Sequence, residues 1–175
     1  MSDGVARDRE LRFTRLLAEA RGFGLEVREV DSTRPWGGYV RFSRSSLGGF
    51  VAVYWQGVHV RHADLDLDAK ILLVAPGHRL SLQSHSKRSE LWRVLEGPVR
   101  IPMGPAEDRL DERLVRPVEV IRIPCGHLHR AVAPRTGWGI VAELWQHEDP
   151  SDPSDEKDIV RHADDYGRPL DEGRE

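Results

Sequence analysis

From residue 50 onward, this chain is a series of short apolar segments separated by glycine and proline. The segments span residues 50–55, 70–74, 90–95, 118–123 and 138–145. No helical period connects them, and apolar runs of this length between turn residues are typical of strands in a barrel or sandwich. The pattern therefore predicts an all-β domain in which each of these segments is extended.

The N-terminal segment differs, because its apolar residues recur at a helical spacing. They fall at positions i, i+3, i+4 and i+7, namely Phe13, Leu16, Leu17 and Ala20, and a glycine follows that would end a helix. We therefore predict an N-terminal helix and lead-in strand over residues 1–33, a barrel over 34–168 and a frayed tail over 169–175. The acidic, proline-containing stretch after Trp145 should be a surface loop.

The length and charge of the chain exclude several classes of protein. Its 175 residues are enough for one domain with its own core. Lys and Arg number 26 against 29 Asp and Glu, and no basic stripe favours nucleic acid. No apolar run approaches the ~20 residues of a membrane span, and the first ten residues have no apolar signal-peptide core. The single cysteine, Cys125, fits a reducing compartment, so we expect a cytoplasmic protein without nucleic-acid or membrane partners.

Four polar side chains have the spacing of metal ligands. Gln83 and His85 are two residues apart, so on a strand they share a face. Glu90 would face the other way on one continuous strand, but the polar residues 86–89 can turn the chain and return it on a neighbouring strand. His129, after a proline–glycine turn, can complete the set from across a barrel. Two imidazoles, a carboxylate and an amide oxygen suit one divalent ion, with zinc as first choice and iron(II), manganese or nickel as alternatives.

Four ordered motifs resemble a known family. Residues 77–97 resemble the first cupin motif, in the variant where glutamine replaces the first histidine. Residues 123–130 resemble the second motif, with His129 in the ligand position. Two outer segments, RPWGGY at 34–39 and DIVR with DDYGR within 158–168, are similar to those of type II mannose-6-phosphate isomerases. The resemblance is to a stand-alone form of the isomerase domain, and it implies a cupin double-stranded β-helix, a jelly-roll-like barrel behind the N-terminal helix.

The resemblance also implies a reaction, the metal-dependent aldose–ketose isomerisation of a sugar phosphate such as mannose 6-phosphate to fructose 6-phosphate. A general base must move a proton between two carbons, and Glu143, a carboxylate in an otherwise apolar run, is our candidate. Arg161 matches a family arginine that closes over the substrate, so it is assigned to both catalysis and substrate binding. Arg88 also matches the family pattern, and Lys70 is a further substrate-binding candidate on the strand before the first motif.

Several alternatives remain open at this point. Glu143 could be a salt-bridged or rim carboxylate, and Arg161 a surface arginine paired with nearby acids. Two histidines and a glutamate also form the ligand set of non-haem iron oxygenases, and a metal-bound sugar-binding or regulatory module without catalysis is a third possibility. The family resemblance further implies a homodimer, in which the apolar helix face at residues 13–20 could pack.

Overall fold

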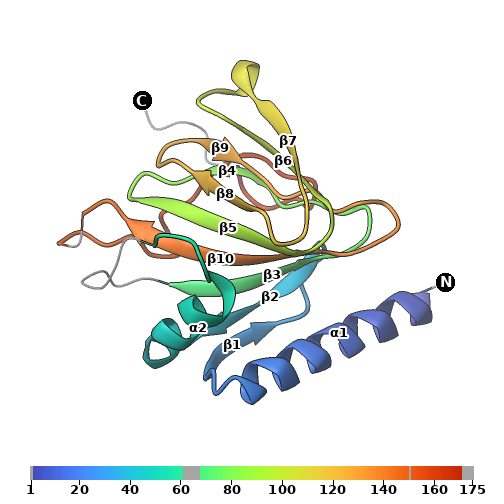
Figure 1. The fold of residues 1–175 in the computed structure, drawn as a ribbon. Coiled ribbons are helices and arrows are strands. Elements are labelled where there is room, and N and C mark those ends of the chain that lie inside the picture. The colour runs from blue at the N-terminus through green and yellow to red at the C-terminus, as the bar shows by residue number, and fades with distance from the viewer. Residues whose placement is uncertain (1, 61–67, 150, 171–175) are drawn as a thin grey trace.

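The structure is a computed structural model that describes residues 2–60, 68–149 and 151–170. Two antiparallel sheets face each other (Figure 1). The first has the order β1-β2-β3-β10-β5-β8, with bounds Val27–Asp31, Gly37–Phe42, Ala69–Val74, Gly139–His147, Arg88–Glu96 and Val120–Ile123. The second has the order β11-β4-β9-β6-β7, with bounds Val160–Ala163, Leu82–Ser84, Leu128–His129, Val99–Gly104 and Asp111–Val115.

The helices are few, and the all-β prediction is confirmed. The two α-helices are α1 (Ser2–Gly22) and α2 (Leu47–Tyr54), and two short 3-10 helices are η1 (Arg44–Ser46) and η2 (Glu107–Arg109). Four of the five apolar segments lie in strands, namely β3, β5, β8 and β10. Among the described residues, no helix is long and apolar enough to cross a membrane.

The prediction of an extended segment over residues 50–55 is wrong, because these residues form most of α2 and its end. The ring of Phe50 packs 4.8 Å from that of Tyr54, one helical turn later, and 4.9 Å from that of Phe42 on β2. A run of six apolar residues has no period that separates a strand from a buried helical turn. Its helical form follows from this packing against the sheet.

The predicted N-terminal helix is confirmed, and it covers the outer face of the first sheet together with α2 (Figure 1). Phe13, Leu16 and Ala20 are buried in the chain's own core against side chains of β2 and β3. These residues are therefore not available to a dimer interface, and a homodimer would have to use other surfaces.

The sheet alternation creates two cores, because successive side chains of a strand point to opposite faces. Outward-facing residues such as Ile71 and Leu73 pack beneath the helices. Inward-facing residues such as Trp92, Val94 and Ile101 pack between the two sheets. One part of the space between the sheets is therefore filled by apolar side chains. The polar side chains of the inner faces lie in another part of the same space.

The Gly-Gly pair of the RPWGGY segment allows β2 to lie close to its neighbour. Gly37 has a φ of 138°, and a Cβ there would lie 1.9 Å from the carbonyl oxygen of Leu73. Only glycine fits such an approach.

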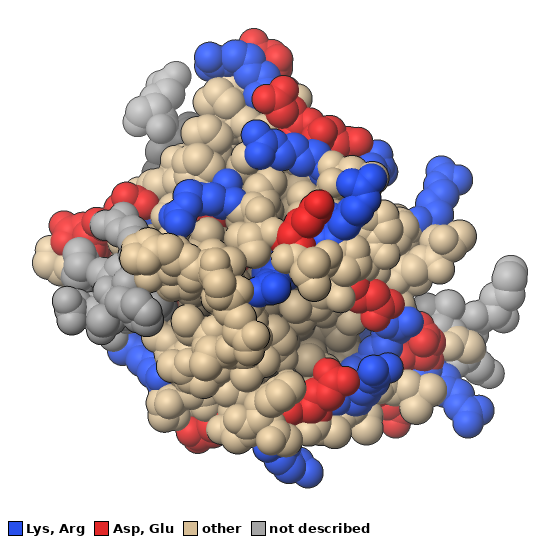
Figure 2. Space-filling view, viewed as in Figure 1, with Lys and Arg blue, Asp and Glu red and all other residues tan. Residues whose placement is uncertain are grey.

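The described residues of the loop that joins β10 to β11, 148–149 and 151–159, are largely exposed, as predicted, and residues 171–175 of the predicted frayed tail lie outside the described residues. On the face shown in Figure 2, basic and acidic side chains lie next to one another and are not gathered by sign.

Candidate metal centre

The segment between β4 and β5 carries the chain from one sheet to the other. His85 directly follows β4 in the second sheet, and Glu90 lies on β5 in the first. Asp158 holds this crossing, because its carboxylate accepts hydrogen bonds from the backbone N–H groups of Ser86 and Lys87 at 2.8 and 3.0 Å. Glu90 therefore returns toward His85 from a strand of the facing sheet, after the turn that the polar segment predicted.

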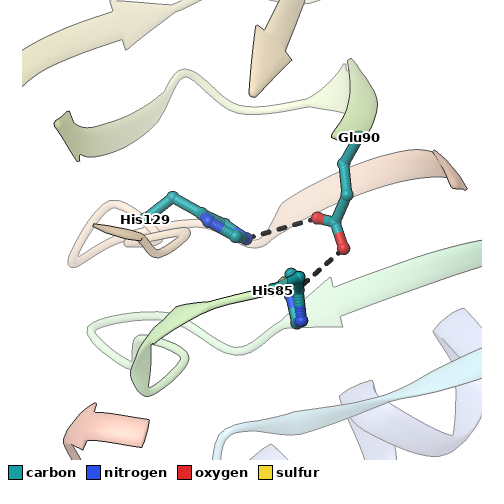
Figure 3. Close-up of side chains that lie close together, drawn as sticks. All are labelled: His85, Glu90 and His129. Carbon is teal, nitrogen blue, oxygen red and sulfur yellow. Dashed lines mark ion pairs between the residues drawn. The ribbon is translucent and has the colours of Figure 1, made fainter. Parts of the chain in front are cut away.

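Three of the four predicted ligands meet between the sheets (Figure 3). Their ligand atoms lie within 4.8 Å of one another. Nε2 of His85 is 3.2 Å from Oε1 of Glu90, and Nε2 of His129, on β9, is 3.3 Å from Oε2. All three residues are at most 2 % exposed, so water cannot readily screen the carboxylate.

Hydrogen bonds to the other ring nitrogens orient both imidazoles. Nδ1 of His85 lies 2.5 Å from the carbonyl oxygen of Asp158, and Nδ1 of His129 lies 2.9 Å from that of His127. A carbonyl only accepts, so each Nδ1 carries a proton, and Nε2 of each ring faces Glu90. Backbone carbonyls commonly orient metal-binding histidines in this way.

This donor set fits a divalent cation. Nε2 of His129 is buried and forms no hydrogen bond with any described residue, although it faces Glu90. Two lone pairs and a carboxylate directed at one point are electron-rich without a positive charge between them. Two imidazoles and one carboxylate suit zinc, iron, manganese or nickel.

Arg88 supplies part of the balancing charge. It is buried, and its Nε donates to Oε1 of Glu90 at 2.8 Å. Its Nη2 lies 3.0 Å from Nε2 of His85. Burial alone would raise the pKa of Glu90, but His85 and Arg88 outweigh it and lower that pKa well below its usual range. Burial lowers the pKa of His85 to about 4. The cluster therefore holds a carboxylate and a neutral imidazole at neutral pH, which are the forms that bind metal.

Gln83 lies beside the cluster, and its role as a ligand stays a prediction. It pairs with His129 across β4 and β9, so its backbone is adjacent to that of a ligand. Its side-chain oxygen accepts a hydrogen bond from Ser81 at 3.1 Å. The side chain is half-buried and lines the neighbouring cavity. His127 contributes its backbone carbonyl to His129 and is not one of the grouped ligands.

A cavity of about 120 Å³ adjoins the metal cluster. The predicted residues outside the metal cluster all line it, namely Lys70, Gln83, Arg88, Glu143 and Arg161. They come from β3, β4, β5, β10 and β11, so both sheets contribute. Five of the lining residues are cationic, namely Lys70, Arg88, Arg161, Arg34 and Arg168. Two are carboxylates, Glu143 and Glu156. The cavity wall therefore has a surplus of positive charge.

Strand register places a row of polar side chains on the inner face of the first sheet, and two of them, Lys70 and Glu143, line the cavity. Arg41 pairs with Lys70, Lys70 with Glu143 and Glu143 with Trp92, across β2, β3, β10 and β5. The indole Nε1 of Trp92 donates to Glu90 at 2.9 Å and lies 3.2 Å from Oε1 of Glu143. Trp92 therefore links the cavity carboxylate to the metal cluster.

Burial shifts the pKa values of Glu143 and Lys70, the two residues in the middle of this row. It raises the pKa of Glu143 to about 7, with the charge of Glu90 acting in the same direction and that of Lys70 opposing it. It lowers the pKa of Lys70 to about 8, with Glu143 opposing the shift. Both groups can therefore exchange protons near neutral pH, which suits acid–base chemistry.

Two residues at this site were missed by the sequence reasoning, Arg41 and Glu156. Arg41 lies two positions after Tyr39 on β2, so strand alternation from the RPWGGY segment could have placed it on the inner face. Glu156 lies in the acidic loop, where no sequence signal separates it from its neighbours. Trp145, expected in the core, is buried beneath the cations, with Lys70 Nζ at 4.1 Å and the Arg88 guanidinium carbon at 3.5 Å from its ring centroid.

Comparison with known proteins identifies the family. A family model described as mannose-6-phosphate isomerase C-terminal matches residues 49–164. The chain belongs to this family. Among curated proteins, no sequence matches the chain. The mannose-6-phosphate isomerase C-terminal match includes the whole metal cluster and every predicted residue of the cavity.

Solved structures show that this chain shares its fold with cupins. Vicilin from hazelnut (Corylus avellana) is similar at a TM-score of 0.54 and 14 % identity, over 77 % of this chain and 34 % of that one. Recombinant oxalate oxidase in complex with glycolate has a TM-score of 0.52 and 17 % identity, over 77 % and 59 %. The capsular polysaccharide assembling protein CapF of Staphylococcus aureus has a TM-score of 0.51 and 17 % identity, over 79 % and 32 %. The chain thus spans about a third to three fifths of these proteins, and the predicted cupin fold is confirmed.

Proposed function

We propose that this protein is a metal-dependent sugar-phosphate isomerase that interconverts an aldose and a ketose, with mannose 6-phosphate and fructose 6-phosphate as the leading pair. One observation carries the proposal. A buried His-Glu-His cluster adjoins a cavity that holds one buried carboxylate, Glu143, in a wall with a surplus of cations. Family membership supports the same reaction class.

Glu143 is the group that moves the proton in this proposal. As a carboxylate it takes the proton from C2 of the aldose, and as the acid it returns a proton to C1. In the same reaction one hydrogen moves from the oxygen on C2 to the oxygen on C1. No oxidant is needed, because the product is an isomer of the substrate. A pKa of about 7 leaves the two forms similarly populated at neutral pH, which favours both half-steps.

The metal and the cations would have separate tasks. A divalent ion, with zinc as first choice, would act as a Lewis acid that stabilises the negative charge that develops on the substrate oxygens. Gln83 could complete its ligand set. Lys70, Arg88 and Arg161 line the cavity and would bind the anionic end of the substrate, for which the arginine fork is well suited. Arg88 would also hold Glu90, which it already contacts.

Turnover of mannose 6-phosphate tests the proposal directly. The protein loaded with zinc, iron(II), manganese or nickel should form fructose 6-phosphate, and the same protein treated with a chelator should not. Metal-loaded protein that binds the sugar phosphate without turnover would replace the proposal with a binding module. Turnover that consumes dioxygen and requires iron would replace it with an oxygenase.

We further propose that the protein is a cytoplasmic homodimer that binds a small-molecule sugar phosphate and has no nucleic-acid or membrane partner. Phe13, Leu16 and Ala20 lie inside the chain, so the dimer would use other exposed apolar residues such as Leu11 and Phe23, which are 61 % and 57 % exposed. The mass in solution, measured by light scattering, tests the dimer, and a monomeric mass would remove it.

A further inference from the structure

The cavity beside the metal cluster contains an anion supplied by the protein itself, the carboxylate of Glu156. Glu156 lies in the loop between β10 and β11 and forms ion pairs with Lys70 and Arg41. Its side chain is 56 % exposed, whereas those of Arg41 and Lys70 are 9 % and 8 % exposed. The carboxylate therefore covers two buried cations from the solvent side.

Among the described residues, no other carboxylate forms ion pairs with both cations. Glu29 and Asp68 each lie 3.8 Å from Arg41, too far for a hydrogen bond. Glu143 faces Lys70 across the strand pair, and its charge opposes the lowering of the Lys70 pKa. Among the described residues, Glu156 is thus the carboxylate that forms ion pairs with both Arg41 and Lys70.

The aromatic ring below this pair fixes its position. Lys70 Nζ lies 4.1 Å from the centroid of the Trp145 ring, and the guanidinium carbon of Arg41 lies 5.9 Å from it. Trp145 is 1 % exposed and pairs with Glu90 across β10 and β5. The two cations are therefore held on the rigid inner face of the sheet, on the same side as the metal cluster.

The size of the cavity indicates that something must leave before a substrate can bind. Its volume is about 120 Å³, and pockets that hold small molecules are typically about 300–1,000 Å³. About half of the residues that line it belong to strands of the two sheets, whereas Glu156 comes from an exposed loop. Displacement of Glu156 enlarges the cavity without disturbing a strand.

Resting on the proposed function, we propose that Arg41 and Lys70 form the subsite for the phosphate of the substrate, and that Glu156 occupies this subsite until the phosphate displaces it. A phosphate monoester carries about −1.5 to −2 charge at pH 7, against −1 for a carboxylate, and presents three acceptor oxygens to the two cations. The phosphate is therefore a stronger ligand of the two cations than the carboxylate of Glu156. When no phosphate is bound, Glu156 keeps the buried cations paired. It also lowers the affinity of the subsite for anions that bind the two cations no more strongly than a carboxylate does.

Calorimetric titration of the metal-loaded protein with inorganic phosphate and with mannose 6-phosphate tests this subsite. Glu156→Gln removes the competing charge and should lower the dissociation constants of inorganic phosphate and of mannose 6-phosphate about tenfold, as expected for one charge-assisted interaction. Asp152→Asn is the matched control, because it removes one charge from the same loop at a site paired with Lys87, and it should leave both constants unchanged. Arg41→Met should weaken both about tenfold.

Unchanged or weaker anion binding by Glu156→Gln would overturn the subsite, as would equal tightening by Asp152→Asn or no anion binding by any variant. The proposed reaction is judged by a separate readout. Tighter phosphate binding by Glu156→Gln without any isomerase turnover keeps the subsite and removes the isomerase. Isomerase turnover with the same Michaelis constant in wild type and Glu156→Gln keeps the isomerase and removes the subsite.

Discussion

Replacement of Glu143 by glutamine should separate catalysis from stability. Glutamine keeps the size of the side chain and an oxygen that can accept the hydrogen bond of the Trp92 indole, now 3.2 Å away, but it cannot take a proton from carbon. A positioned general base typically contributes about 10²–10⁴-fold to the rate. We expect kcat of the metal-loaded variant to fall by about that factor while its metal content stays the same.

The same substitution should not destabilise the protein above neutral pH. Burial raises the pKa of Glu143 from 4.5 to about 7, so the folded state binds the proton more tightly than the unfolded state. The stability that this provides is fully present below pH 4.5 and is lost as the pH rises through 7. At about 1.4 kcal/mol per pH unit, the loss is about 3 kcal/mol. Glutamine does not ionise, so between pH 4.5 and 8 the difference in unfolding free energy should shift by about 3 kcal/mol in favour of the variant.

Urea denaturation of both chelated proteins across this pH range measures the shift, and turnover of mannose 6-phosphate by the metal-loaded proteins measures the rate. A carboxylate that serves only as the ion-pair partner of Lys70 gives the opposite pattern. The variant would then lose stability at pH 8 and keep its turnover. That stability loss, or a kcat within about threefold of wild type, would refute the assignment of Glu143 as the base.

Three further substitutions test other parts of the structure. His129→Ala removes a fully buried member of the His-Glu-His cluster and should reduce the metal content to well below one ion per chain by elemental analysis, and wild-type metal content would contradict its assignment as a ligand. Phe50→Ala should lower the unfolding free energy by about 3–5 kcal/mol in urea, because the ring is completely buried between α2 and β2, and an unchanged midpoint would contradict that packing. Arg12→Ala should cost no more than about 1 kcal/mol, because its ion pair with Glu96 at 2.7 Å is partly exposed. A larger loss would mean that α1 depends on that pair.

Much of the fold followed from local patterns. Four short apolar segments are strands, and the i, i+3, i+4, i+7 spacing around Phe13 marks a helix. Both patterns arise from the periods of 2.0 and 3.6 residues with which side chains return to one face. The segment at residues 50–55 has no such signal, because it is short and apolar throughout, and its helical form depends on packing against the sheet, as in the contact of Phe50 with Phe42 of β2.

The metal cluster was also predictable to a large degree. Spacing within one segment brings His85 and Glu90 to the same point once the polar turn carries the chain between sheets, and Asp158 supplies the contacts that hold that turn. The second motif identifies His129, which reaches the cluster from β9. Gln83 shares the register of His129, but whether its amide oxygen binds the metal depends on a side-chain rotation that no spacing specifies.

The sequence by itself determined which residues could bind a metal, where the strands lie and which way each side chain faces within its own strand. Only the tertiary structure decided which strands are neighbours and in what register. Arg41, Lys70 and Glu143 form one row because β2, β3 and β10 pair in a particular alignment, although more than one hundred residues separate the first from the last. Burial then sets the pKa values of Lys70 and Glu143, and a distant loop places Glu156 over the cations. Strand alternation is a local property of the backbone, whereas register and burial are properties of the whole packed chain.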